Sequence, residues 1–286
     1  MYIGFSSYSS YWEKTKPKNI FEELRFAKSL GFNCFGLNLD NDANKRLGRF
    51  SLMKLKSLAK KLDMKLIVRC PHHLNTSLDN KKILRSVKKS INIAKLLGSD
   101  RILIHAGDIT TTVEKHPIIA EKLKGKTREQ IFKEGGGIIN EFSVLKQYNN
   151  LIKNLNKIVL IAEKKGLMVA LENNGEYYQF GSNIKEFKDI YRKVPGLKMS
   201  ISSGHANING NNFLKYLRIF KGSIINMDLH DNMGDKDTHL SIGKGNINFK
   251  PLKLFLKDKR FTCLIDTYRD DWIKESIIKL KEIIKD

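Results

Sequence analysis

The chain has 286 residues, of which 41% are hydrophobic and 29% are charged. This is enough apolar material for a folded core and argues against a disordered chain. No apolar run approaches the roughly 18 residues that span a membrane, and no basic and apolar stretch typical of a signal peptide opens the sequence. The three cysteines are too few and too far apart for a disulfide framework. We therefore expect a cytoplasmic protein without a membrane partner.

The formal net charge of +22 raises the possibility of a nucleic-acid partner. The lysines, however, are spread through almost every expected helix and do not form one basic tract. A lysine-rich, solvated surface is the simpler interpretation. Nucleic-acid binding is kept as an alternative.

Expected strands and helices alternate along the whole chain. Short apolar runs predict strands at 2–5, 33–39, 64–69, 100–105, 168–172, 197–202, 223–229 and 261–266. Helical spacing of apolar residues predicts helices at 19–30, 51–62, 79–97, 141–165, 183–193, 211–220, 250–256 and 271–284. A long segment at about 106–137 interrupts the pattern, and we expect a further helix within it at 127–133.

Eight strand–helix pairs without a linker favour one α/β domain over residues 1–286, a closed (β/α)8 TIM barrel. Parallel neighbours and right-handed crossovers follow from this alternation. No Gly-x-Gly-x-x-Gly follows the first strand, so the sequence gives little support to a dinucleotide-binding fold.

Polar and ionisable side chains stand at the carboxyl ends of six expected strands, where such barrels hold their chemistry. In chain order they are Arg69 and His72, His105, Glu172, Ser202 and His205, Asp228 with Asp237 and His239, and finally Asp266. We expect them to converge on one pocket. A buried carboxylate such as Glu172 needs a partner or a metal, whereas a single histidine such as His105 is also compatible with a structural hydrogen bond. His72 and His73 are equally compatible with an exposed loop.

One subset has the composition of a metal site. His205, Asp237 and His239 supply two imidazoles and a carboxylate, a common set for divalent metals. The pair Asp237 and His239 is also compatible with a solvated loop.

Three motifs resemble the xylose-isomerase-like TIM barrel superfamily: LENNG at Glu172, SGHAN at His205, and LHDNMGDKDTHLSIGKGNINF from Leu229. This superfamily includes sugar and sugar-phosphate isomerases and epimerases, and the endonuclease-IV-type abasic-site nucleases (AP endonuclease family 2). The resemblance covers essentially the whole chain, and its last two motifs are closer to the isomerase branch.

Carried over from the isomerase branch, the resemblance implies a divalent metal on Glu172, Asp228 and Asp266. Ser202 stands where the family has a fourth, acidic ligand. Glu172 and Asp266 would also be the acid and base that move protons through an enediolate. The oxygen ligands favour Mn²⁺ or Mg²⁺ over Zn²⁺. Substrate contacts are expected from Arg69, His72, His105, Asn173 and Ser202.

The nuclease branch implies a three-zinc cluster, which is incomplete here because of Arg69 and Ser202. Arg69 replaces a histidine ligand, and a guanidinium cannot bind a metal. The third-zinc set of His205, Asp237 and His239 is complete, so a second possibility is that this set alone carries the metal.

Three functional hypotheses follow. The first is a metal-dependent isomerase or epimerase acting on a small polyol or sugar phosphate. The alternatives are a zinc-dependent abasic-site nuclease relative and a non-catalytic binding barrel. A homo-oligomer is possible under each of them.

Overall fold

A computed structural model of the chain describes residues 1–7, 18–40, 44, 46–72, 74–79, 81–109, 141–176, 179–208, 212–255 and 261–285. The strands are β1 (Tyr2–Phe5), β2 (Cys34–Asn38), β3 (Lys65–Arg69), β4 (Arg101–Ile104), β5 (Met168–Glu172), β6 (Lys198–Ser202), β7 (Ile224–Leu229) and β8 (Thr262–Ile265). The helix predicted at 127–133, His73 and nearly all of the segment at 106–137 lie outside the described residues.

Helices follow the strands as predicted. They are α1 (Ile20–Ser29), α3 (Arg49–Lys61), α4 (Lys81–Leu97), α7 (Glu141–Glu163), α8 (Ile184–Lys193), α9 (Ser203–Ile208), α10 (Phe213–Phe220), the 3-10 helix η1 (Lys250–Phe255) and α11 (Asp270–Lys285). Asparagine side chains cap three of them: Asn19, Asn183 and Asn212 accept hydrogen bonds from backbone N–H groups of the first turn. No helix in the described part of the chain is long and apolar enough to cross a membrane.

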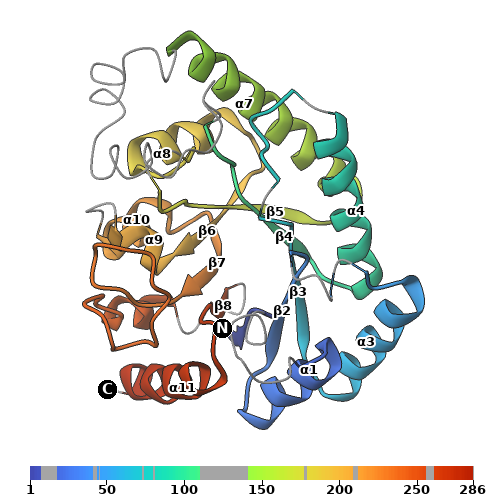
Figure 1. Cartoon of the computed structure of the whole chain (residues 1–286), viewed down its shortest axis with the longest axis vertical. Helices are drawn as coiled ribbons and strands as arrows, with labels where there is room; N and C mark the ends of the chain where they lie inside the picture. Colours follow the sequence, from blue (N-terminus) through green and yellow to red (C-terminus); the bar gives the residue numbers. More distant parts are fainter. Residues whose placement is uncertain are drawn as a thin grey trace.

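The eight strands form one parallel sheet in the order β1-β8-β7-β6-β5-β4-β3-β2. Its two ends meet, because Asn33 N donates to Ile3 O at 3.0 Å and Ser7 N donates to Gly36 O at 2.8 Å. Figure 1 shows the strands at the centre and the helices around them. The prediction of a single-domain (β/α)8 TIM barrel is confirmed as a nearly closed barrel.

Glycine allows the first and second strands to approach closely. A Cβ atom on Gly4 would lie 2.1 Å from the carbonyl oxygen of Cys34, closer than any side chain tolerates. The barrel can therefore close at this point only because residue 4 has no side chain.

Strand alternation brings the ionisable residues to the interior of the barrel. Ile67, Ala170 and Leu264 belong to one small apolar cluster contributed by several strands. Arg69 and Glu172 each lie two residues after a member of that cluster, so they face the same side of the sheet, one layer closer to the carboxyl end.

Candidate active site

Arg69, the last residue of β3, is surrounded by carboxyl groups. Its Nη2 lies 2.9 Å from Glu172 Oε2, and its Nη1 lies 2.6 Å from Asp228 Oδ1 and 3.6 Å from Asp266 Oδ2. Nη1 also donates to Ser6 Oγ at 3.0 Å. All five side chains are buried. The guanidinium thus lies where three predicted metal ligands converge, and its fixed charge opposes a cation between them.

The three carboxyl groups differ in their protonation equilibria. Burial raises the pKa of Glu172 and raises that of Asp228 well above its usual value, although Arg69 opposes both shifts. For Asp266, burial acts in the same direction, but Arg69 and then His239 outweigh it and lower the pKa. Two carboxyl groups whose pKa values are pushed apart form an arrangement suited to one acid and one base.

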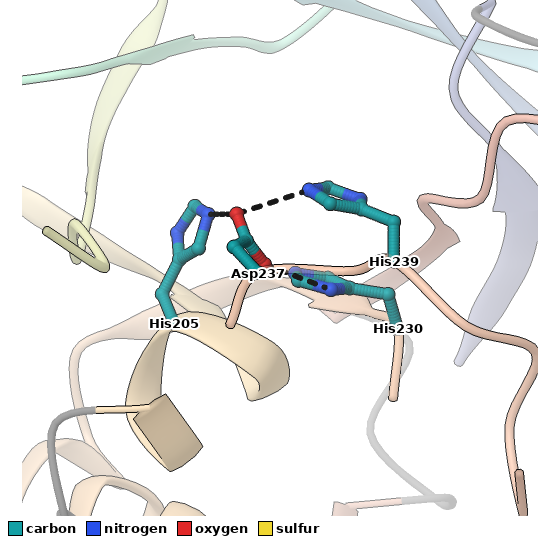
Figure 2. Close-up of side chains that lie close together, drawn as sticks. All are labelled: His205, His230, Asp237 and His239. Carbon is teal, nitrogen blue, oxygen red and sulfur yellow. Dashed lines mark hydrogen bonds and ion pairs between the residues drawn. The ribbon is translucent and has the colours of Figure 1, made fainter. Parts of the chain in front are cut away.

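A second group of side chains surrounds Asp237 (Figure 2). Asp237 Oδ2 lies 3.1 Å from His205 Nε2 and 3.2 Å from His239 Nε2, and Asp237 Oδ1 lies 3.5 Å from His230 Nδ1. One ligand atom from each of these four residues lies within 4.8 Å of all the others. We call His205, His230, Asp237 and His239 the histidine cluster.

The ring nitrogens that point away from Asp237 are held by other parts of the barrel rim. His205 Nδ1 lies 2.8 Å from the carbonyl oxygen of Asn173, and His239 Nδ1 lies 2.5 Å from that of Asp266. The His230 Nε2 atom lies 2.9 Å from Ser202 Oγ. Such bonds fix ring orientation and are usual for metal-binding histidines.

Local structure explains how these side chains come together. His205 lies in α9, which begins directly after β6, and His230 directly follows β7. The loop that carries Asp237 and His239 is closed by a pair of backbone hydrogen bonds between Asp231 and Leu240, at 3.0 and 2.9 Å. His239 has a positive φ of 48°, a conformation that few non-glycine residues adopt.

Asp237 controls the charge of the histidine cluster. Burial would lower the pKa of His205 and His239, but Asp237 outweighs it, raising the pKa of His205 to about 10 and raising that of His239 as well. Burial would raise the pKa of Asp237, but the imidazoles, His205 foremost, hold it well below its usual value. Burial and then neighbouring His239 keep the pKa of His230 well below its usual value.

Both groups border one cavity of about 150 Å³. Its lining consists of Asn38, Asp40, Arg69, Cys70, His72, His105, Glu172, His205, Asp237, His239, Asp266 and Tyr268. The cavity is lined mainly by polar and charged side chains. It suits a small hydrophilic molecule.

The remaining predicted substrate contacts divide into two groups. His72 and His105 line the cavity, with their rings 4.4 Å apart, and His105 Nε2 lies 3.4 Å from Glu172 Oε2. Burial lowers the pKa of both imidazoles. Asn173 and Ser202 do not line the cavity. They bond to each other instead, Ser202 N donating to Asn173 Oδ1 at 2.7 Å.

Comparison with known proteins places this arrangement in a family. The family model described as xylose isomerase-like TIM barrel matches residues 24–283. The chain belongs to this family. The resemblance predicted from the three motifs is therefore confirmed.

Among sequence relatives, this xylose isomerase-like barrel is 34% identical over 154 residues to MJ1614 of Methanocaldococcus jannaschii. That match covers 52% of the chain and only 59% of the relative. Two solved structures share the fold along nearly the whole length. A D-tagatose 3-epimerase-like protein has a TM-score of 0.77 at 21% identity, over 100% of this chain and 97% of the other. The IolI protein, solved with a bound zinc atom, has a TM-score of 0.75 at 16% identity, over 100% of this chain and 98% of the other.

The histidine cluster of this xylose isomerase-like barrel fits a divalent metal. Two of its buried atoms, His230 Nδ1 and Asp237 Oδ1, have no hydrogen-bond partner among the described residues. Three imidazoles and one carboxylate are ligands that Zn²⁺ and similar ions accept. The raised pKa values of His205 and His239 favour protons on these rings, and a bound ion would compete with those protons. The predicted metal set on Glu172, Asp228 and Asp266 stays a prediction.

His230 was missing from the sequence-based set of metal ligands. The resemblance assigned the ligand position of the seventh strand to Asp228, two residues earlier. A signal was present, because a histidine directly after a buried strand is carried to the same rim as the other site residues. The sequence does not reveal that its ring stacks on His239, with centroids 3.8 Å apart.

Proposed function

We propose that this barrel is an isomerase or epimerase of a small hydroxy-carbonyl polyol, with a divalent ion held by the histidine cluster. One observation carries the proposal: Glu172 and Asp266 border the same small polar cavity and have oppositely shifted pKa values. The solved relatives support the substrate class, since they include epimerases for D-tagatose, D-psicose and L-ribulose.

The two carboxyl groups divide the work between them. Asp266, whose pKa is lowered, is ionised and takes the proton from the carbon next to the substrate carbonyl. Glu172, whose pKa is raised, is the better proton donor of the two and delivers a proton to carbon. One C–H bond breaks and one forms, so the product is an isomer of the substrate. Both groups then return to their starting protonation by exchange with water.

Other residues of the cavity hold the substrate. The imidazoles of His72 and His105 have lowered pKa values and are neutral, so each offers one donor and one acceptor to hydroxyl groups. Tyr268 lies against His239, with ring centroids 4.3 Å apart, and completes one wall. A metal ion in the histidine cluster would polarise a substrate oxygen.

The test is solvent exchange at carbon. The protein, supplied with Mn²⁺, is incubated in D₂O with D-tagatose, D-psicose or L-ribulose, and deuterium in the recovered sugar is measured by NMR. We expect incorporation with at least one of them. Glu172→Gln should reduce the rate by about a hundredfold or more, while Glu163→Gln, at an exposed position outside the cavity, should leave it unchanged.

The fold of Glu172→Gln is checked by circular dichroism. If a folded Glu172→Gln protein exchanged deuterium as fast as the wild type, the assignment of this pocket would be wrong. Incision of abasic-site DNA without sugar exchange would support the nuclease alternative in its place.

A further inference from the structure

Arg69 is a buried cation that has no atom able to bind a metal. Its neighbours, however, are carboxyl groups of the kind that surround a bound metal ion. The side chain of Arg69 is 7% exposed. Carboxyl groups from three different strand ends approach it, at 2.6 Å (Asp228), 2.9 Å (Glu172) and 3.6 Å (Asp266). Buried carboxyl groups need a positive partner, and these three share one guanidinium.

The carboxyl groups retain unused bonding capacity. Glu172 Oε1 and Asp266 Oδ1 are buried and have no hydrogen-bond partner among the described residues. Several carboxylate oxygens converging on one point form the kind of site that hard divalent ions occupy. If the guanidinium were absent, its three neighbours would have the composition of such a site.

Arg69 also faces the reacting region. It lines the cavity together with Glu172 and Asp266, the two residues between which proton transfer is proposed. A fixed positive charge at this position stabilises negative charge that develops on a substrate oxygen, without any rearrangement during the reaction.

We propose that Arg69 is the built-in cation of this pocket: its guanidinium fills a latent divalent-metal site formed by Glu172, Asp228 and Asp266, and stabilises the substrate oxyanion there. The second half rests on the proposed function. The first half concerns only the residues around Arg69, whereas the histidine cluster borders the same cavity with other side chains.

The experiment compares metal content among variants. Wild type, Arg69→Ala and Arg101→Ala are dialysed with Mn²⁺, freed of excess ion, and analysed for metal per chain. Arg101 is the matched control, because it is also buried and is paired with Asp100 at the opposite end of the strands. We expect Arg69→Ala to bind about one more ion per chain than wild type, as three carboxylates allow, and Arg101→Ala to bind no more than wild type.

A second variant covers the case in which Arg69→Ala does not fold. Arg69→His replaces the guanidinium by a shorter side chain that can be a neutral metal ligand, and should gain the same ion and a higher melting temperature with Mn²⁺. Arg69→Lys keeps the charge and should gain none. If neither Arg69→Ala nor Arg69→His gained an ion, the inference would be overturned.

The outcomes separate this inference from the proposed function. A gain of one ion over a metal-free wild type would support the latent site while contradicting metal binding by the histidine cluster. If the Arg69 variants bound no more metal per chain than wild type, this inference would be contradicted. Deuterium exchange into the sugar by the wild type would still support the proposed function.

Discussion

Gly204 lies where any side chain would meet the imidazole of His230. A Cβ atom built on it would be 2.1 Å from His230 Cε1 and 2.4 Å from Nδ1. The ring cannot move away easily, because it is stacked on His239 and held by Ser202 Oγ. The absence of a side chain at residue 204 therefore leaves His230 free to direct Nδ1 towards Asp237.

We expect Gly204→Ala to displace His230 and weaken metal binding. Overpacking at such a site typically costs about 1–3 kcal/mol of stability, which denaturant unfolding measures. The matched control is Gly222→Ala, because a Cβ at Gly222 meets nothing within 4 Å. A Gly204→Ala protein that bound Mn²⁺ as tightly as the control would exclude His230 from the site.

The same residues show what a sequence can and cannot predict about a site. Glu172, His205 and Asp266 were identified because the ends of apolar strands are visible in sequence, and a barrel carries them to one rim. Arg69 was expected in the same pocket, but its direct pairing with Glu172 and Asp228 was not visible, because it depends on side-chain contacts between strands far apart in the chain. The contact of His230 with Asp237 was not visible for the same reason.

At the scale of elements, strand and helix positions were predictable and short helices were less so. Strands β1 and β5 have the predicted ends, and the ends of the other strands agree within one residue. Helix α9, with six residues, had not been predicted, because one and a half turns give no apolar period to recognise. Helix η1 had been predicted as an ordinary helix and is a 3-10 helix.

An ion-pair group ties the amino-terminal ends of β3 and β4 together. Asp100 binds Arg101 at 2.8 Å and Lys65 at 2.8 Å. Burial would raise the pKa of Asp100, but Arg101 and Lys65 outweigh it and lower the pKa to about 2. Because the pKa is lower in the folded chain, Asp100 stabilises the fold above its ordinary pKa of about 3.9, and this contribution is lost as the pH falls through about 2.

We expect Asp100→Asn to be less stable than wild type at neutral pH. The difference between the two should be constant from about pH 5 to 7 and shrink as the pH falls from about 4 towards 2. Urea unfolding across this pH range measures the difference in the free energy of unfolding. The control is Asp235→Asn, because Asp235 is exposed. A difference that grew as the pH fell would contradict the role given to Asp100.

At the scale of the whole molecule, the lining of the cavity is richer in acidic residues than the chain is. The chain carries a formal net charge of +22, whereas four carboxyl groups line the cavity: Asp40, Glu172, Asp237 and Asp266. Arg69, the guanidinium among the lining residues, is already paired with carboxyl groups. The basic surface therefore gives no reason to expect an anionic substrate in this pocket.

We expect the protein to prefer an uncharged polyol over its phosphate ester. Arg69, the guanidinium among the described lining residues, is already paired with carboxyl groups. A phosphate would therefore give up its water without gaining a new guanidinium partner there, and the ester should bind at least about tenfold weaker. Calorimetric titration of the Mn²⁺-loaded protein with a ketose and with its phosphate tests this. Tighter binding of the phosphate would contradict this expectation.

The proposed role of the histidine cluster depends on its binding a divalent ion beside the two proton-transferring carboxyl groups. The decisive measurement is the metal-to-chain ratio after dialysis with Zn²⁺ or Mn²⁺, for wild type and for Asp237→Asn combined with His239→Ala. We expect about one ion per wild-type chain and none in the folded double variant. A metal-free wild type, or a double variant that keeps its ion, would contradict it.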